Sequence, residues 1–411
     1  MRIIYDIGLR VYYLLILLAS PWNPKAAKWI SGRKGWREQL EKAFSEGDKV
    51  IWFHCASLGE FEQGRPIIEM VRKEYPEYKI LLSFFSPSGY EKRKNYDRVD
   101  HVCYLPLDTR RNARDFVSRV PLEKVFFIKY EFWYHTLRRI NKAGIPLYLA
   151  SGKFLKSHFF FRWYGSWYRK VFSYFTHIFV QDEESESLLA KNRISNVSVA
   201  GDTRFDRVVE ISATHRRSDE RALFPNSLPV IVAGSTWEKD EMLLKEVYYA
   251  LEGSCNWIIA PHEPSAQNIA RLTKFFPGAV LYSDILMGKE IMDDVLLVDT
   301  IGHLSSLYRK GNIAYIGGGF GKGIHNILEA TAAGLPVFFG PKMQRFKEAV
   351  DLQTEGGAYV IQQVNDLHSG IRALVSNEKL LIRRSQIAVN YTHSNTGATR
   401  AIVNHVFKSI S

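Results

Sequence analysis

The sequence has few cysteines and no metal or redox pattern built from them. Three occur among the 411 residues, Cys55, Cys103 and Cys255, and no two of them form a CxxC pair. Their spacing argues against a zinc ribbon and against a thioredoxin-type site. A sparse, odd number is typical of a reducing compartment. Low-complexity tracts and fixed-period repeats are also absent from the sequence, which argues against disordered and fibrous classes.

Long apolar runs are lacking too. The run from Tyr12 to Ala19 is shorter than the roughly 20 residues that cross a bilayer, and Asp6 and Arg10 interrupt the stretch before it. Basic residues dominate up to Arg37, which suits an anionic cytoplasmic membrane face. We therefore expect residues 1–35 to form a membrane-associated N-terminal segment. A cleaved signal peptide and a helix buried in the first domain are the alternatives.

The charge balance is basic, with 55 Lys and Arg against 43 Asp and Glu. Such a balance favours an anionic partner, although a solvated basic surface explains it equally well. The segment from Lys153 to Lys170 contains five basic residues, eight aromatics and no acid. This composition fits single-stranded nucleic acid, a lipid headgroup layer, or aromatics that fill a core. Beside the apolar N-terminus, we favour a surface for an acidic lipid.

Short apolar runs alternate with amphipathic segments from residue 50 onwards, a pattern that predicts parallel sheets with crossover helices. The expected strands of the first half are 50–55, 80–85, 102–105, 124–128, 147–150 and 178–180. Those of the second half are 230–233, 257–260, 280–282, 295–298, 313–316, 337–339 and 359–361. The polar stretch 206–229 is expected to link them. We predict an N-terminal α/β domain at 36–208, a C-terminal α/β domain at 229–390 and a C-terminal helix at 391–411. Ligands of such sheets bind beyond the carboxyl ends of the strands.

Two acids follow strand ends in the first half. Glu60 comes after the strand 50–55 and a tight turn at Gly59, and Glu131 follows the strand 124–128. A carboxylate at such a place can accept a proton from an incoming hydroxyl. The alternative is that each acid only favours a helix N-terminus electrostatically.

The strongest local pattern follows the strand 313–316. Five glycines lie within the seven residues 317–323, and they precede His325, Asn326 and an apolar helix that contains Glu329. Backbone N–H groups of such a loop can approach a phosphate closely, with Asn326 as the helix N-cap. Neither a Walker loop nor a dinucleotide GxGxxG spacing is present. A glycine-rich turn needed only for packing is the alternative.

Other strand ends carry polar residues that are either ligand contacts or helix caps. Gly234, Ser235 and Thr236 follow one strand, and Asp299 and Thr300 follow another. His262-Glu263 begins like a zinc HExxH motif, which fails because residue 266 is alanine.

Together these motifs resemble the 3-deoxy-D-manno-octulosonic acid (Kdo) transferase family of lipopolysaccharide synthesis. The matching stretches are HCASLGE at 54–60, SPSG at 86–89, YEFW at 130–133, GDTRFD at 201–206, AGSTWEKDE at 233–241, DTIGHL at 299–304, GGGF at 317–320 and HNILEA at 325–330.

The resemblance implies a GT-B glycosyltransferase, with two Rossmann-like domains facing a cleft and an N-terminal membrane-associated helix. It implies CMP-Kdo as donor, a lipid A precursor (lipid IVA) as acceptor, no metal and no other cofactor. It places the enzyme on the cytoplasmic face of the inner membrane, against its anionic surface, with no nucleic acid partner.

The resemblance also assigns roles. Glu60 matches the catalytic base, and Glu131 matches a second glutamate of the cleft. The residues expected to bind the nucleotide are Ser235, Thr236, His262, Gly318, Gly319, His325, Asn326 and Glu329. Those expected to bind the acceptor are Ser86, Ser88, Lys153 and Lys156.

The chain departs from the family at two places. His262-Glu263 stands where many members carry Arg-His, and Ser151-Gly152-Lys153 replaces an Asn-Ala-Arg segment, so that Lys153 supplies the cation. Two other classes are weighed against the transferase: a nucleotide-sugar epimerase of similar two-domain fold, and a non-enzymatic nucleic-acid binder.

Overall fold

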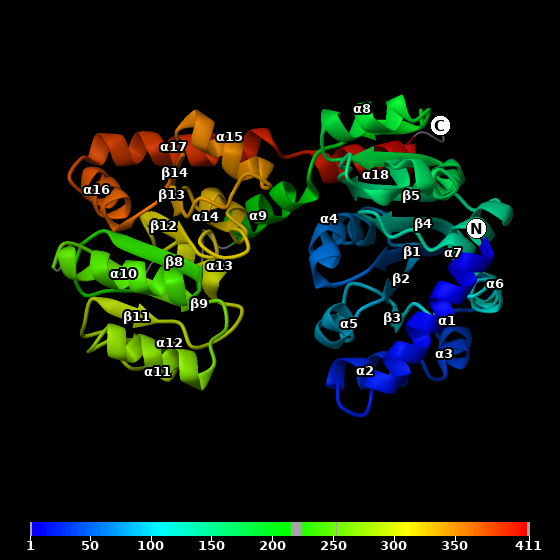
Figure 1. Cartoon of the computed structure of the whole chain (residues 1–411), viewed down its shortest axis with the longest axis horizontal. Helices are drawn as coiled ribbons and strands as arrows, with labels where there is room; N and C mark the ends of the chain where they lie inside the picture. Colours follow the sequence, from blue (N-terminus) through cyan, green and yellow to red (C-terminus); the bar gives the residue numbers. More distant parts are fainter. Residues whose placement is uncertain (1, 215–222, 252, 409–411) are drawn as a thin grey trace. The chain divides into compact units, whose positions relative to one another are not determined.

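The computed structural model describes residues 2–214, 223–251 and 253–408, apart from the side chains of residues 164 and 214. The chain divides into two compact units, each drawn in Figure 1. Unit 1 comprises Met1–Arg207 and Thr396–Ser411, and unit 2 comprises Val208–Asn395. Each unit contains one seven-stranded sheet whose paired strands are parallel, which confirms the predicted α/β fold class.

The sheet of unit 1 has the strand order β3-β2-β1-β4-β5-β6-β7. Its strands are β1 (Val50–Cys55), β2 (Lys79–Phe84), β3 (His101–Tyr104), β4 (Leu122–Ile128), β5 (Leu147–Gly152), β6 (His177–Val180) and β7 (Val197–Val199). The helices between them are α4 (Leu58–Glu74), α5 (Pro87–Arg93), α6 (Arg110–Arg119), α7 (Tyr134–Lys142), the 3₁₀ turns η1 (Phe159–Phe161), η2 (Trp163–Gly165) and η3 (Tyr168–Tyr174), and α8 (Glu183–Lys191).

Side chains of the central strand β1 alternate between two cores. Trp52 packs in a cluster with residues of α6, α7 and the aromatic segment after β5, whereas Phe53 packs in a second cluster with α4. Successive residues of a strand point to opposite faces, so two full layers of helix bury both faces of this sheet. The register aligns Cys55 with Phe84 and Phe84 with Tyr104, so that the loops after β1, β2 and β3 meet at one edge.

The N-terminal helix α1 (Arg2–Ala19) lies on unit 1 but leaves most of its apolar surface uncovered. Leu9 is its one buried residue, while Leu15 is 59% exposed and Trp22, just beyond the helix, is 84% exposed. The alternative of a helix buried in the first domain is therefore wrong. No helix in the described part of the chain is long and apolar enough to cross a membrane. Two short helices, α2 (Pro24–Ser31) and α3 (Trp36–Ala43), lead from α1 to the sheet.

The C-terminal end of the chain packs with unit 1. Helix α17 (Glu378–Ser394) continues past residue 391, where the C-terminal helix was expected to begin, and α18 (Ala398–Lys408) follows after Gly397. Asp206 accepts hydrogen bonds from Gly397 N at 2.6 Å and Thr399 N at 2.7 Å, which caps α18. Ile402, Val403 and Val406 then join the same core cluster as Phe53.

The sheet of unit 2 has the order β10-β11-β9-β8-β12-β13-β14. Its strands are β8 (Val230–Thr236), β9 (Asn256–Pro261), β10 (Val280–Leu281), β11 (Val295–Leu297), β12 (Ile313–Ile316), β13 (Val337–Phe339) and β14 (Ala358–Val360). Besides α17, its helices are α9 (Thr203–Thr214), which begins in unit 1, α10 (Glu238–Ala250), α11 (Ala266–Phe275), α12 (Tyr282–Leu286), α13 (Leu304–Tyr308), α14 (Leu328–Ala332), α15 (Lys347–Glu355) and α16 (Val364–Val375).

The stretch predicted to be a linker, 206–229, begins inside α9. This helix starts in unit 1 and ends in unit 2, and its apolar residues Phe205 and Val208 are buried. Residues 215–222 of the predicted linker lie outside the described residues.

Candidate active site

Glu60 lies in the first turn of α4, directly beyond the carboxyl end of β1. The Ser57 hydroxyl donates a short hydrogen bond to its carboxylate, and the Lys129 ammonium lies 4.0 Å from Glu60 Oε1. The Glu60 side chain is 19% exposed. The carboxylate is thus fixed by a hydroxyl and a cation while it still reaches solvent.

Lys129 reaches Glu60 from a backbone conformation that lysine seldom adopts. It follows the last residue of β4 with φ of 65°, in the left-handed region. Such a conformation costs a non-glycine residue of order 1 kcal/mol or more and recurs at functional sites. The sequence pattern alone did not single out Lys129, although its place between a strand end and Glu131 was a usable signal.

Glu131 lies close enough to Glu60 for the two charges to interact. Burial, followed by the negative charge of Glu60, raises the pKa of Glu131 to about 7, against a hydrogen bond from Trp133 that lowers it. The charges of both acids also contribute to the raised pKa of Tyr130, behind burial as the main cause. The structure therefore brings together the two acids that the sequence placed at separate strand ends. A carboxyl group with a pKa near 7 exchanges protons readily at neutral pH.

Ser86 and Ser88 occupy the start of α5, beyond β2. Ser86 is the N-cap, and its hydroxyl accepts a hydrogen bond from Ser88 N at 3.3 Å. Arg33 donates to the carbonyl of the neighbouring Phe85 at 2.7 Å, with its guanidinium 3.7 Å from the centre of the Trp29 ring. Burial lowers the pKa of Arg33 to about 9.

The two predicted acceptor lysines differ in their surroundings. Lys153 Nζ lies 3.8 Å from Oδ2 of Asp182, which is the N-cap residue of α8. Lys156 is exposed. Two aromatics of the segment that contains them, Phe154 and Phe160, are buried and pack on each other and on Phe172 just beyond it. These two rings fit the alternative in which the aromatics fill the core, whereas Phe159 is 48% and Trp163 87% exposed.

In unit 2 the glycine loop after β12 packs tightly against neighbouring strand ends. A Cβ at Gly317 would lie 2.2 Å from the carbonyl oxygen of Ser235, and one at Gly319 would lie 2.5 Å from Gly340 N. Gly318 has φ of 93°, which favours glycine. Close packing thus accounts for these three glycines.

Several groups expected to contact a nucleotide already have partners within unit 2. Asp240, which is buried, accepts hydrogen bonds from Gly318 N at 2.9 Å and Tyr315 Oη at 2.7 Å. The hydroxyl of Thr236 donates to buried Glu241 at 3.1 Å. These bonds shape the loop, and they engage the amide of Gly318 and the hydroxyl of Thr236.

Three rings form a stack beside the same loop. The ring centres of His262 and His325 lie 4.3 Å apart, and those of Trp237 and His262 lie 4.7 Å apart. Trp237 Nε1 donates to His325 Nε2 at 2.8 Å. Burial and the neighbouring His262 lower the pKa of His325 to about 4, so that this imidazole is neutral at pH 7. The structure therefore brings His262 and His325 together from two separate strand ends.

Asn326 and Glu329 lie at a helix start that differs from the expected one. Helix α14 begins at Leu328 with Ile327 at the N-cap position, and Asn326 Oδ1 accepts from Leu328 N at 3.2 Å. Asn326 was expected to be the N-cap of this helix. It lies one residue before the N-cap position, and its side chain accepts the hydrogen bond of the first helical residue. Glu329 lies in the first turn and lines a narrow recess with Ser305 and Arg309.

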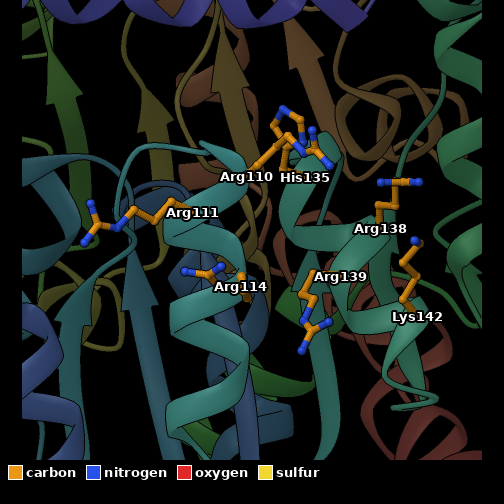
Figure 2. A pocket seen from close by; sticks show the side chains of 7 residues that line it. All are labelled: Arg110, Arg111, Arg114, His135, Arg138, Arg139 and Lys142. Atoms are coloured by element: carbon orange, nitrogen blue, oxygen red, sulfur yellow. The ribbon is translucent and has the colours of Figure 1, made fainter.

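A basic pocket, which the sequence analysis missed, lies between α6 and α7 of unit 1. Figure 2 shows its seven side chains on these two helices. The lining residues are Arg110, Arg111, Arg114, His135, Arg138, Arg139 and Lys142, around a cavity of about 460 Å³. The signal in the sequence was a repeated spacing: basic residues at 110, 111 and 114 and again at 138, 139 and 142.

The fold of the chain is that of known nucleotide-sugar enzymes with two α/β domains. The chain is similar to a UDP-GlcNAc 2-epimerase from Neisseria meningitidis, with a TM-score of 0.62 and 16% identity over 88% of this chain and 100% of that one. An identity this low carries the fold alone, and here it supports the GT-B architecture.

Sequence relatives point to one activity class. Residues 33–207 match the family described as 3-Deoxy-D-manno-octulosonic-acid transferase (kdotransferase). A 3-deoxy-D-manno-octulosonic acid transferase of Haemophilus influenzae is 24% identical over 94% of this chain and 92% of its own length. One of Chlamydia trachomatis is 26% identical over 83% and 81%. These matches confirm the predicted resemblance to the Kdo transferase family, and the chain is a glycosyltransferase.

Proposed function

We propose that this chain transfers Kdo from CMP-Kdo to a lipid A precursor, lipid IVA, with Glu60 as the general base. One observation carries the assignment of the base. Glu60 lies at the carboxyl edge of the first sheet, held by Ser57 and Lys129 and partly open to solvent. Beside it, Glu131 has a pKa raised to about 7.

The proposed reaction is a single displacement. The Glu60 carboxylate accepts the proton of an acceptor hydroxyl as that oxygen forms a bond to the anomeric carbon of Kdo. The bond from this carbon to the phosphate oxygen of CMP breaks, and the electron pair leaves with CMP. The Lys129 ammonium lies 4.0 Å from Glu60 Oε1 and helps to hold the carboxylate in place. Glu131 lies beside Glu60 and is proposed to line the acceptor side of the site.

Unit 2 would hold the nucleotide. Ser235, His262, His325, Asn326 and Glu329 lie at strand ends or helix starts of one sheet. Thr236, Gly318 and Gly319 shape the loop beside them through the contacts with Glu241, Asp240 and Gly340. Ser86, Ser88, Lys153 and Lys156 are proposed to contact the acceptor. The polar side chains and helix N-termini of unit 2 can stabilise a leaving phosphate without a metal.

The proposed place of action is the cytoplasmic face of the inner membrane. Helix α1 exposes the apolar side chains of Ile4, Leu14, Leu15 and Leu18 to water. Their transfer from water into an apolar lipid layer would be favourable. A lipid acceptor lies in that same layer. This part of the proposal rests on the exposed apolar face of α1.

The test is an incubation of the purified full-length chain with CMP-Kdo and lipid IVA, followed by mass spectrometry of the lipid. We expect the mass of the acceptor to increase by one or more Kdo residues and CMP to be released. An unchanged acceptor with an isomerised sugar nucleotide would indicate an epimerase and would overturn the proposal.

A further inference from the structure

Four of the seven residues that line the basic pocket between α6 and α7 lack a carboxylate partner among the described residues. Arg110, Arg138, Arg139 and Lys142 line it, and none of them forms an ion pair with any residue that the structure describes. Arg139 Nε is in addition buried without a hydrogen-bond partner. Like charges held around one cavity repel one another, and an anion placed among them removes that repulsion.

The nearest acids do not neutralise the pocket. Asp115 pairs with two lining residues, Arg114 at 3.1 Å and Arg111 at 3.8 Å, and it is shared with Arg37 at 3.0 Å, which does not line the pocket. His135 is hydrogen bonded to Asp6. The cavity of about 460 Å³ is larger than one phosphate group, and five arginines among its lining residues offer the planar fork that binds phosphate oxygens in pairs.

Hydrogen bonds connect the exposed apolar helix α1 to His135 of the pocket wall, one directly and one through Asp108. Asp6 Oδ1 lies 2.6 Å from His135 Nε2, a lining atom. One residue earlier, Tyr5 donates to buried Asp108 at 2.6 Å, and Asp108 also accepts from His135 N at 2.8 Å. The exposed Ile3, Ile4 and Ile7 lie within one turn of Asp6. The exposed apolar side chains of α1 and the pocket therefore lie next to one another in unit 1.

We infer that this pocket binds the phosphate of an anionic phospholipid headgroup and fixes unit 1 on the membrane together with α1. The inference rests on the membrane part of the proposed function and adds a specific site to it. The neighbouring apolar helix favours a lipid-borne phosphate over a free one. A row of basic side chains spread over an open surface would give only a diffuse attraction to anionic lipid.

The test compares two double variants of the full-length chain with the same change of charge. Arg110→Glu with Lys142→Glu alters two exposed lining residues that have no ion pair among the described residues. Lys379→Glu with Arg383→Glu makes the matched change on exposed positions of α17 in unit 2. Sedimentation with vesicles of phosphatidylcholine, with and without phosphatidylglycerol, measures binding without any donor sugar or turnover.

We expect the pocket variant to lose at least about tenfold of its affinity for the anionic vesicles, since each basic residue near such a surface adds to the attraction. The α17 variant should keep wild-type affinity. Arg138→Gln removes one lining charge and introduces no new one. It serves as a second pocket variant if the double variant fails to fold, and it should also bind the anionic vesicles more weakly than the wild type. Equal losses in the pocket and α17 variants would overturn the inference.

A comparison of two salts distinguishes a site that binds phosphate specifically from a general electrostatic attraction to anionic lipid. Sodium phosphate should displace the wild-type chain from anionic vesicles more strongly than sodium chloride at equal ionic strength, and the pocket variant should show no such difference. Equal displacement of the wild type by both salts would contradict a phosphate site. Because these readouts do not use transfer, a failed transferase assay leaves them intact, and the reverse also holds.

Discussion

The raised pKa of Glu131 makes a direct prediction about stability and pH. The pKa of this carboxyl rises from 4.5 to about 7 on folding, chiefly through burial and then through the charge of Glu60. The folded chain therefore binds more protons than the unfolded chain between these values, and stability falls as pH rises through that window. One pKa unit corresponds to about 1.4 kcal/mol, so the full penalty is about 3 kcal/mol above pH 7.

Glu131→Gln removes this penalty, because the amide imitates the protonated acid and still accepts the hydrogen bond from Trp133. We expect the variant to be more stable than the wild type by about 3 kcal/mol at pH 8 and by less than about 1 kcal/mol at pH 5. Urea unfolding followed by tryptophan fluorescence at both pH values measures the difference. Glu77→Gln, at an exposed position, is the control and should change stability little at either pH. An equal gain at both pH values, or a loss at pH 8, would refute the reasoning.

Three further predictions follow from packing and exposure. Gly319→Ala should destabilise the chain by about 1–3 kcal/mol in a thermal melt because its Cβ meets backbone, whereas Gly321→Ala, with its nearest atom at 3.4 Å, should be tolerated. Leu15→Ser should reduce recovery with membranes and leave the melting temperature unchanged, whereas the buried Leu9→Ser should lower it. Asp108→Ala should cost about 3 kcal/mol in urea unfolding, because several buried donors lose their acceptor. Unchanged stability of Gly319→Ala or Asp108→Ala would contradict the packing described for each.

The fold was largely predictable because the buried strands are apolar runs of strand length. Ile313–Ile316 and Val337–Phe339 have the bounds predicted for them, since every residue of both is buried. The strand Val197–Val199 was missed because it is short, contains a serine and lies at the sheet edge, half-exposed. Residues 206–214 of the segment expected to be a linker are part of α9, where burial of Val208 outweighs the polar composition.

The site was predictable only in part, since its decisive contacts join distant residues. Strand ends identified Glu60 and Glu131, but the bond from Gly318 to Asp240 spans 78 residues and has no local pattern. The stack of His262 on His325 likewise depends on two loops of the sheet. The basic pocket needs α6 and α7 side by side, which the sequence does not state.

The central claim, that Glu60 is the base of Kdo transfer, is tested most directly by Glu60→Gln. The amide keeps the shape of the side chain but cannot accept the proton, and loss of a general base typically costs about 10²–10⁴-fold in rate. The measurement is single-turnover transfer from CMP-Kdo to lipid IVA, with CMP binding and the melting temperature checked beside it. We expect the rate to fall by at least about a hundredfold while binding and folding are kept. A variant that transfers at the wild-type rate would remove Glu60 from the mechanism.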